Sequence, residues 1–173
     1  MVSSIIVKQK IARLMRWPLL HELMLWSMKL VVPRQRIGVS MIALDEAERI
    51  LFLKHVFHPS VPWGLPGGWL GRNEAPARGV LRELYEETGL TAVLGPIVHT
   101  ALEEAPTHIG MAYLAQIQPG ELKLSQEIIE ARWFPLHNLP QPQYPFTEQA
   151  IRSAVKIHRL KNGQREECSF IIN

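Results

Sequence analysis

The stretch that decides the fold reads GGWLGRNEAPARGVLRELYEETGL and runs from Gly67 to Leu90. It opens on two glycines, where the backbone can approach an ion or a phosphate closely. From Ala75 to Thr88 the residues favour a helix, and Gly89 stands where helices commonly end. The stretch therefore predicts a glycine turn, a loop and one helix.

Three glutamates lie on one face of that expected helix. Glu83, Glu86 and Glu87 are spaced i, i+3 and i+4, and like charges at this spacing weaken an isolated helix. A hard divalent cation such as Mg²⁺, which prefers oxygen ligands, would compensate for their repulsion. Arg82 can also pair with Glu86 one turn further on and hold that carboxylate in place. An ordinary solvated acidic face is the alternative explanation for such a cluster.

The spacing of the defined residues matches a known signature. Gly68 is followed after five residues by Glu74, and after seven more by the run Arg82-Glu83-Leu84-Tyr85-Glu86-Glu87-Thr88-Gly89-Leu90. At every defined position this pattern resembles the signature of the Nudix hydrolases. The resemblance implies an α/β/α sandwich with a mixed sheet. It also implies hydrolysis of a nucleoside diphosphate linked to another moiety, with Mg²⁺ or Mn²⁺ as cofactor.

The resemblance further implies which residues hold the metal. They are Glu83, Glu86, Glu87 and the carbonyl of Gly67. Glu83 is also the candidate for polarising the attacking water, and we expect Glu87 to be a second catalytic residue. Cations held in this way would neutralise the charge on the attacking and leaving oxygens of a diphosphate.

Other residues are expected to support or complete this site. Arg82, Glu74 and Gly68 would orient the helix and its carboxylates, although Glu74 could equally act as a charge at the helix N-terminus. In some Nudix hydrolases the general base is an acid that follows the signature. The candidates here are Glu103, Glu104, Glu127 and Glu130, and we favour the last two because they lie just before Trp133-Phe134.

Residues for substrate contact are predicted from their place in the chain. Lys54 and His55 end a strand-like run and could reach phosphate oxygens, and Trp63 could stack on a base. An exposed strand end explains Lys54 and His55 equally well, and an aromatic residue beside a proline-rich loop is more often a packing residue. Pro106 lies sixteen positions beyond Leu90, a spacing that resembles the ADP-ribose pyrophosphatase subgroup. Nucleoside triphosphates and nucleotide sugars stay open as substrates.

Strand-like and helical patterns flank the signature. A polar turn at 45–49 separates two apolar runs, which predicts a hairpin of 37–44 and 50–56. Further strand-like runs and a last helix cover 92–102, 109–117, 131–134 and 147–160. This mixture predicts a sheet packed between helices, in a Nudix domain over 35–173.

Residues 1–34 lie outside the resemblance and form an expected helical extension. The apolar spacing predicts one helix around 5–15 and a second from Pro18 to about Leu30. The pair would pack on the domain or on the second subunit of a homodimer. A peripheral membrane contact is the alternative, because basic residues flank a tryptophan-rich apolar segment.

Charge and cysteine content limit the partners and the compartment. Residues 1–36 hold seven basic residues and one acidic residue, so this segment is +6 within a chain of net +3. The remaining body is therefore acidic, at −3, which argues against nucleic acid as the main partner. Cys168 is the single cysteine and cannot form an internal disulfide, so we expect a reducing, cytoplasmic location.

Two other classes of function compete with the hydrolase. A Nudix-like sensor that binds a nucleotide without cleaving it would usually have lost one or more of the signature glutamates, and all are present here. An interaction module acting through the basic N-terminal segment would leave the acidic helix unexplained. The intact signature therefore favours the enzyme.

Overall fold

The computed structural model describes residues 17–31, 35–104 and 106–161. The chain divides into two units, Met1–Gln35 and Arg36–Asn173. In the first unit, helix α2 (Pro18–Val31) matches the second predicted N-terminal helix and starts at a proline, a residue suited to the first helical turn. The first predicted helix and Cys168 lie outside the described residues. Among the described helices, none is long and apolar enough to cross a bilayer.

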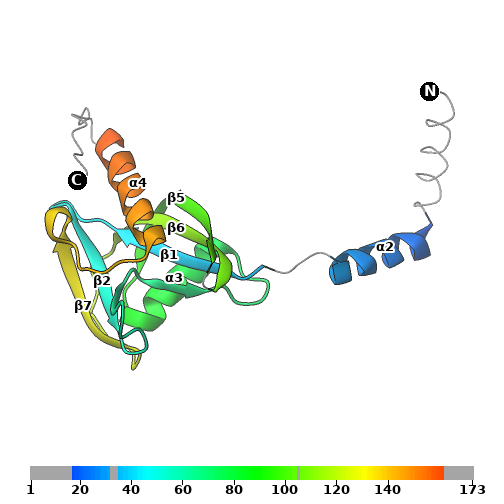
Figure 1. Ribbon diagram of the computed structural model, residues 1–173, viewed down its shortest axis with the longest axis horizontal. Helices are drawn as coiled ribbons and strands as arrows, with labels where there is room; N and C mark the ends of the chain where they lie inside the picture. The colour runs from blue at the N-terminus through cyan, green and yellow to red at the C-terminus, as the bar shows by residue number, and fades with distance from the viewer. Residues whose placement is uncertain (1–16, 32–34, 105, 162–173) are drawn as a thin grey trace. The chain divides into compact units, whose positions relative to one another are not determined.

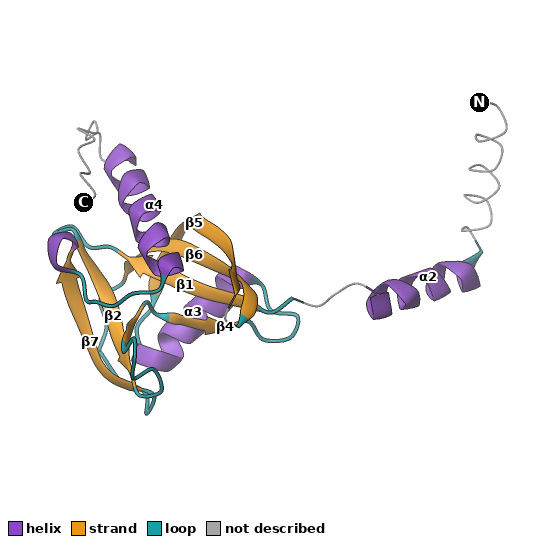
Figure 2. Ribbon diagram, in the orientation of Figure 1, coloured by secondary structure: helices purple, strands orange, loops and turns teal. Residues whose placement is uncertain are grey.

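The strands of the second unit form two sheets, coloured orange in Figure 2. The larger sheet has the order β4-β1-β6-β5, with β1 (Ile37–Ala43), β4 (Gly67–Trp69), β5 (Ala92–Glu104) and β6 (Thr107–Ile117). The smaller sheet has the order β3-β2-β7, with β2 (Arg49–His55), β3 (Trp63–Gly64) and β7 (Ile128–Pro135). Strands β1 and β6 run parallel, and the other strand pairs described are antiparallel. The mixed sheet is thus as predicted.

Two helices cover opposite faces of the larger sheet. These are α3 (Pro76–Thr88) and α4 (Pro145–Lys161), and Figure 1 shows the sheet between them. A short 3₁₀ turn, η1 (Leu136–Asn138), leads from β7 toward α4. The predicted α/β/α arrangement and both predicted body helices are confirmed.

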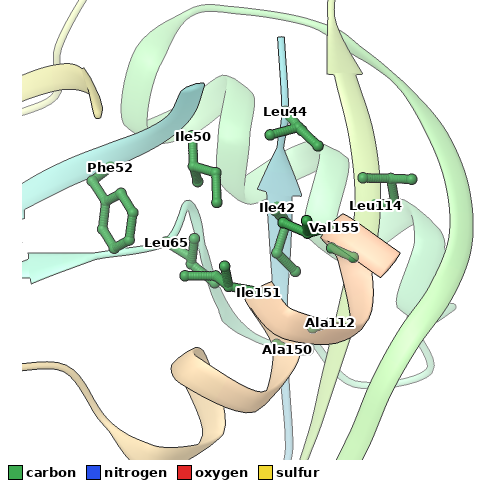
Figure 3. Packing of buried hydrophobic residues seen from close by; sticks show 11 residues of the cluster. Ile42, Leu44, Ile50, Phe52, Leu65, Ala112, Leu114, Ala150, Ile151 and Val155 are labelled. Atoms are coloured by element: carbon green, nitrogen blue, oxygen red, sulfur yellow. The ribbon is translucent and has the colours of Figure 1, made fainter. Parts of the chain in front are cut away.

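Alternation along β1 explains how both helices are held. Met41 faces α3 and packs with Leu84 of that helix. Ile42, the next residue, faces the other way and packs with Ile151 of α4. Figure 3 shows the second cluster, in which side chains from β1, β2, β6 and α4 meet. Successive residues of a strand point to opposite faces, so one buried strand anchors both helices.

The predicted hairpin of 37–44 and 50–56 is wrong. Both strands exist, but a single bridge between Leu44 and Ile50 links them. Beyond it, β1 pairs with β4 and β6, whereas β2 pairs with β3 and β7. A strand has only two hydrogen-bonding edges, and long-range partners occupy both edges of each strand. The polar turn therefore leads from one sheet to the other.

Candidate active site

Helix α3 carries the acidic face, and its C-terminal end anchors a later segment. Gly89 ends the helix in the left-handed conformation, with φ 71°, and its N–H donates to the Tyr85 carbonyl at 2.8 Å. The Glu87 carbonyl accepts from the Ser125 N–H at 3.0 Å, and the Thr88 carbonyl accepts from Lys123 at 2.8 Å. The chain that leads to Glu127 is thereby tied to the end of the acidic helix.

The two glycines bring backbone against two of the carboxylates. The Gly67 N–H donates to Glu87 Oε2 at 3.1 Å. A Cβ added at Gly67 would lie 2.1 Å from the carbonyl oxygen of Val39 on β1. A Cβ at Gly68 would lie 2.6 Å from the carboxylate carbon of Glu83. At Gly67 the clash is with backbone, which explains the requirement for glycine there, whereas a side chain at Gly68 would displace the Glu83 carboxylate.

Arg82 connects three of the carboxylates. Its Nε and Nη2 donate to the two oxygens of Glu74 at 2.9 and 3.0 Å. Its Nη1 lies 2.9 Å from Glu83 Oε1 and 2.8 Å from Glu86 Oε2. The hydrogen bonds from Arg82 and from the Gly71 N–H lower the pKa of Glu74 to about 2. Glu74 therefore stays ionised and fixes the guanidinium beside the acidic face.

Glu87 is the most deeply buried of the signature glutamates, with 9% of its surface exposed. Burial is the main cause that raises the pKa of its carboxyl group to about 8; the Gly67 hydrogen bond opposes it, and the neighbouring charges of Glu83, Glu127 and Glu86 add to it. Burial also raises the pKa of Glu83, partly offset by Arg82. Folding therefore disfavours the ionised form of both groups, and Glu87, unlike Glu83, has no cation among the causes of its pKa shift.

The candidate metal ligands are the carboxylates of Glu83, Glu86 and Glu87 and the carbonyl of Gly67. Their chemistry fits a hard divalent cation, since every donor atom is an oxygen. Among the residues the structure describes, no three acidic, histidine or cysteine side chains form a ready-made metal cage. Arg82 occupies oxygens of both Glu83 and Glu86. A cation would therefore compete with the guanidinium for these oxygens.

The structure separates the candidates for the general base. Glu127 interacts electrostatically with the carboxyl group of Glu87, and its carbonyl accepts from the Val56 N–H at 2.9 Å. Glu130 instead accepts a hydrogen bond from Arg132 Nε at 2.9 Å. Glu103 Oε1 lies 2.9 Å from Nε2 of the buried His108 on the β5–β6 hairpin. Of these acids, the structure associates Glu127 with the acidic helix.

The residues predicted for substrate contact lie on the smaller sheet. Lys54 of β2 and Trp63 of β3 are register partners, with Lys54 Nζ 5.9 Å from the Trp63 ring centroid. Arg132 of β7 also lies over this ring, its Cζ 5.5 Å from the centroid. Sequence reasoning missed Arg132, because only cross-strand pairing brings it near Trp63. Two cations thus lie near the ring of Trp63, which stands four residues before Gly67.

His55 is half-buried and packs beside Gly64 and His58. Its Nε2 would lie 3.1 Å from a Cβ added at Gly64, and its ring centroid is 5.5 Å from that of His58. Burial, and then repulsion from His58, lower the pKa of His55 to about 4. The folded protein therefore holds this ring neutral at pH values where an unfolded chain would protonate it.

Acidification should consequently destabilise the protein through His55. Between its unfolded pKa of 6.5 and its folded pKa of about 4, the unfolded state binds more protons, so the free energy of unfolding falls as pH falls. We expect His55→Gln to flatten this dependence, and His137→Gln, at an exposed position of η1, to leave it unchanged. Urea unfolding between these pH values measures both slopes. Equal slopes for His55→Gln and the unsubstituted protein would contradict the conclusion that His55 causes this pH dependence.

The fold and the acidic helix together define a hydrolase of phosphoric anhydrides. A family model described as the NUDIX domain matches residues 34–154, and the chain belongs to the Nudix family. An ADP-ribose pyrophosphatase of Methanocaldococcus jannaschii is 31% identical over 127 residues, covering 69% of this chain and 72% of the relative. The NAD-capped RNA hydrolase NudC of Vibrio cholerae is 30% identical over 100 residues, but the match covers only 37% of its length and 57% of this chain.

Solved structures agree with this family. A MutT NUDIX hydrolase from Burkholderia pseudomallei is 29% identical with a TM-score of 0.59, covering 70% of this chain and 98% of that one. A NUDIX hydrolase from Nitrosomonas europaea has a TM-score of 0.65 at 19% identity, covering 76% of this chain and 75% of that one. The second likeness concerns the fold alone.

Proposed function

We propose that this protein is a divalent-metal-dependent pyrophosphohydrolase that cleaves a nucleoside diphosphate linked to another moiety. The observation that carries the proposal is the buried carboxylate of Glu87, held on the Gly67 N–H beside Glu83. Burying like charges together is costly unless positive charge joins them. Bound Mg²⁺ or Mn²⁺ would supply that charge and neutralise the diphosphate.

In this proposal the residues of the signature divide the work. Glu83, Glu86, Glu87 and the Gly67 carbonyl hold the cation, and Glu83 polarises the attacking water. Arg82, fixed by its two hydrogen bonds to Glu74, sets the position of the Glu83 and Glu86 carboxylates. The domain that carries them extends over 35–173, with 1–34 as a separate extension.

Glu127 is the better supported general base. Its charge acts on Glu87, whereas Glu130 is bound to Arg132. The hydrogen bonds between the segment 123–125 and the end of α3 hold Glu127 at this end of the site. A base must lie within reach of the attacking water, which favours the acid that the fold ties to the acidic helix.

ADP-ribose is the first substrate to test. The relative from Methanocaldococcus jannaschii, matched over 72% of its length, is named an ADP-ribose pyrophosphatase. Other relatives are named for NAD-capped RNA and 8-oxo-(d)GTP, and all three compounds contain a phosphoric anhydride. Lys54 and Arg132, whose Nζ and Cζ atoms lie 5.9 and 5.5 Å from the centre of the Trp63 ring, could bind an anionic part of such a substrate.

A substrate panel with and without metal tests the proposal. We expect one or more of ADP-ribose, nucleotide sugars, dinucleotides and nucleoside triphosphates to be cleaved at the anhydride. Chelator should abolish turnover, and added Mg²⁺ or Mn²⁺ should restore it, because the carboxylates cannot neutralise a diphosphate themselves. Chromatography of the products identifies the bond broken. Binding without turnover on every member would instead support a nucleotide sensor.

A further inference from the structure

Helix α2 carries large apolar side chains that are exposed. Leu19, Leu23 and Trp26 are spaced i, i+4 and i+7 and therefore share one face. They are 72%, 64% and 65% exposed, so no described residue of their own unit covers them. Trp17, which is 68% exposed, immediately precedes the helix. Such a surface requires an apolar partner.

The core of the second unit does not depend on α2. Its three clusters of buried apolar side chains draw all their members from the strands, helices and loops of Arg36–Asn173. They include both faces of β1 and the inner faces of α3 and α4. The domain therefore has a complete interior without the apolar face of α2.

The charge around α2 indicates the partner. Basic residues occur on both sides of its apolar sequence, at Lys8, Lys10, Arg13, Arg16, Arg34 and Arg36. With Lys29 and Glu22 they give residues 1–36 a net charge of +6. A symmetric dimer built through this segment would bring two such charges together, which is unfavourable. An anionic surface with an apolar interior complements both properties.

We propose that helix α2 binds the surface of an anionic lipid bilayer, with Leu19, Leu23 and Trp26 inserted among the lipids. The 14 residues of α2 rise only about 21 Å, less than the roughly 30 Å of bilayer hydrocarbon, so the helix lies in the interface. Tryptophan and leucine on the apolar face, with lysine and arginine around it, are the composition that such helices use.

Vesicle sedimentation with the full-length protein tests the proposal. We expect at least about tenfold more protein bound to vesicles of phosphatidylcholine with phosphatidylglycerol than to phosphatidylcholine alone, and release at high salt, because salt screens the attraction. The double substitution Leu23→Glu and Trp26→Glu should abolish binding. The control Val93→Glu and Leu102→Glu alters residues of β5 that are 59% and 63% exposed, and should bind normally.

Several results would overturn the proposal. One is that the unsubstituted protein stays in the supernatant with anionic vesicles, a result that needs no variant. Another is undiminished binding of the α2 variant, once its thermal unfolding shows that it is folded. A third is self-association that analytical ultracentrifugation detects and the α2 substitutions abolish, without lipid binding; the partner would then be a second copy of the chain.

Discussion

Glu83→Gln is expected to lower kcat by about 10²-fold or more, the range for losing a group that acts on the proton of the attacking water. Glutamine keeps the shape of the side chain and can still accept one hydrogen bond from Arg82, but it removes the charge. Arg82 retains its bonds to Glu74 and Glu86. The loss should therefore appear in turnover and only weakly in KM.

The fold should tolerate this substitution. Burial raises the pKa of Glu83, so its ionised form at neutral pH is disfavoured by folding, and a neutral glutamine removes that cost. Urea unfolding should show a free energy no lower than that of the unsubstituted protein. Glu148→Gln on α4, an exposed position, is the matched control. It should change neither kcat nor the free energy of unfolding. An unchanged kcat for Glu83→Gln would refute the catalytic role of this carboxylate.

Gly67→Ala should damage stability and activity together. A Cβ at this position would lie 2.1 Å from the Val39 carbonyl oxygen and 2.6 Å from the Ser40 Cα, and both are backbone atoms that cannot rotate away. The φ of 153° adds strain for any residue with a side chain. Overpacking and backbone strain each cost about 1–3 kcal/mol, so we expect a loss of roughly 3 kcal/mol in the free energy of unfolding.

Activity should be lost because the same displacement moves the N–H that holds Glu87. Gly120→Ala is the control, since a Cβ there meets nothing closer than Leu90 Cδ2 at 3.4 Å. Its unfolding free energy and turnover should stay near those of the unsubstituted protein. If Gly67→Ala proved equally harmless in urea unfolding, the close approach of β4 to β1 would be excluded.

Long-range pairing explains what sequence reasoning missed. The strands β3 and β4 are two and three residues long, too short for an alternating pattern to reveal. Arg132 reaches Trp63 only because β7 and β3 flank β2. The sequence alone does not distinguish Glu127 from Glu130 as the general base. In the structure, hydrogen bonds at the end of α3 hold the segment that leads to Glu127, whose charge acts on Glu87. Glu130 instead pairs with Arg132.

The acidic helix, the glycine that ends it and the two glycines that precede it were predictable from sequence, because caps, helical spacing and backbone freedom are properties of neighbouring residues. Tertiary structure alone decided that the polar turn at 45–49 joins two sheets, since the edges of β1 and β2 are taken by strands distant in the chain. It also decided how far burial shifts the pKa of Glu87. Burial and strand partners depend on residues far apart in sequence, which local patterns do not encode.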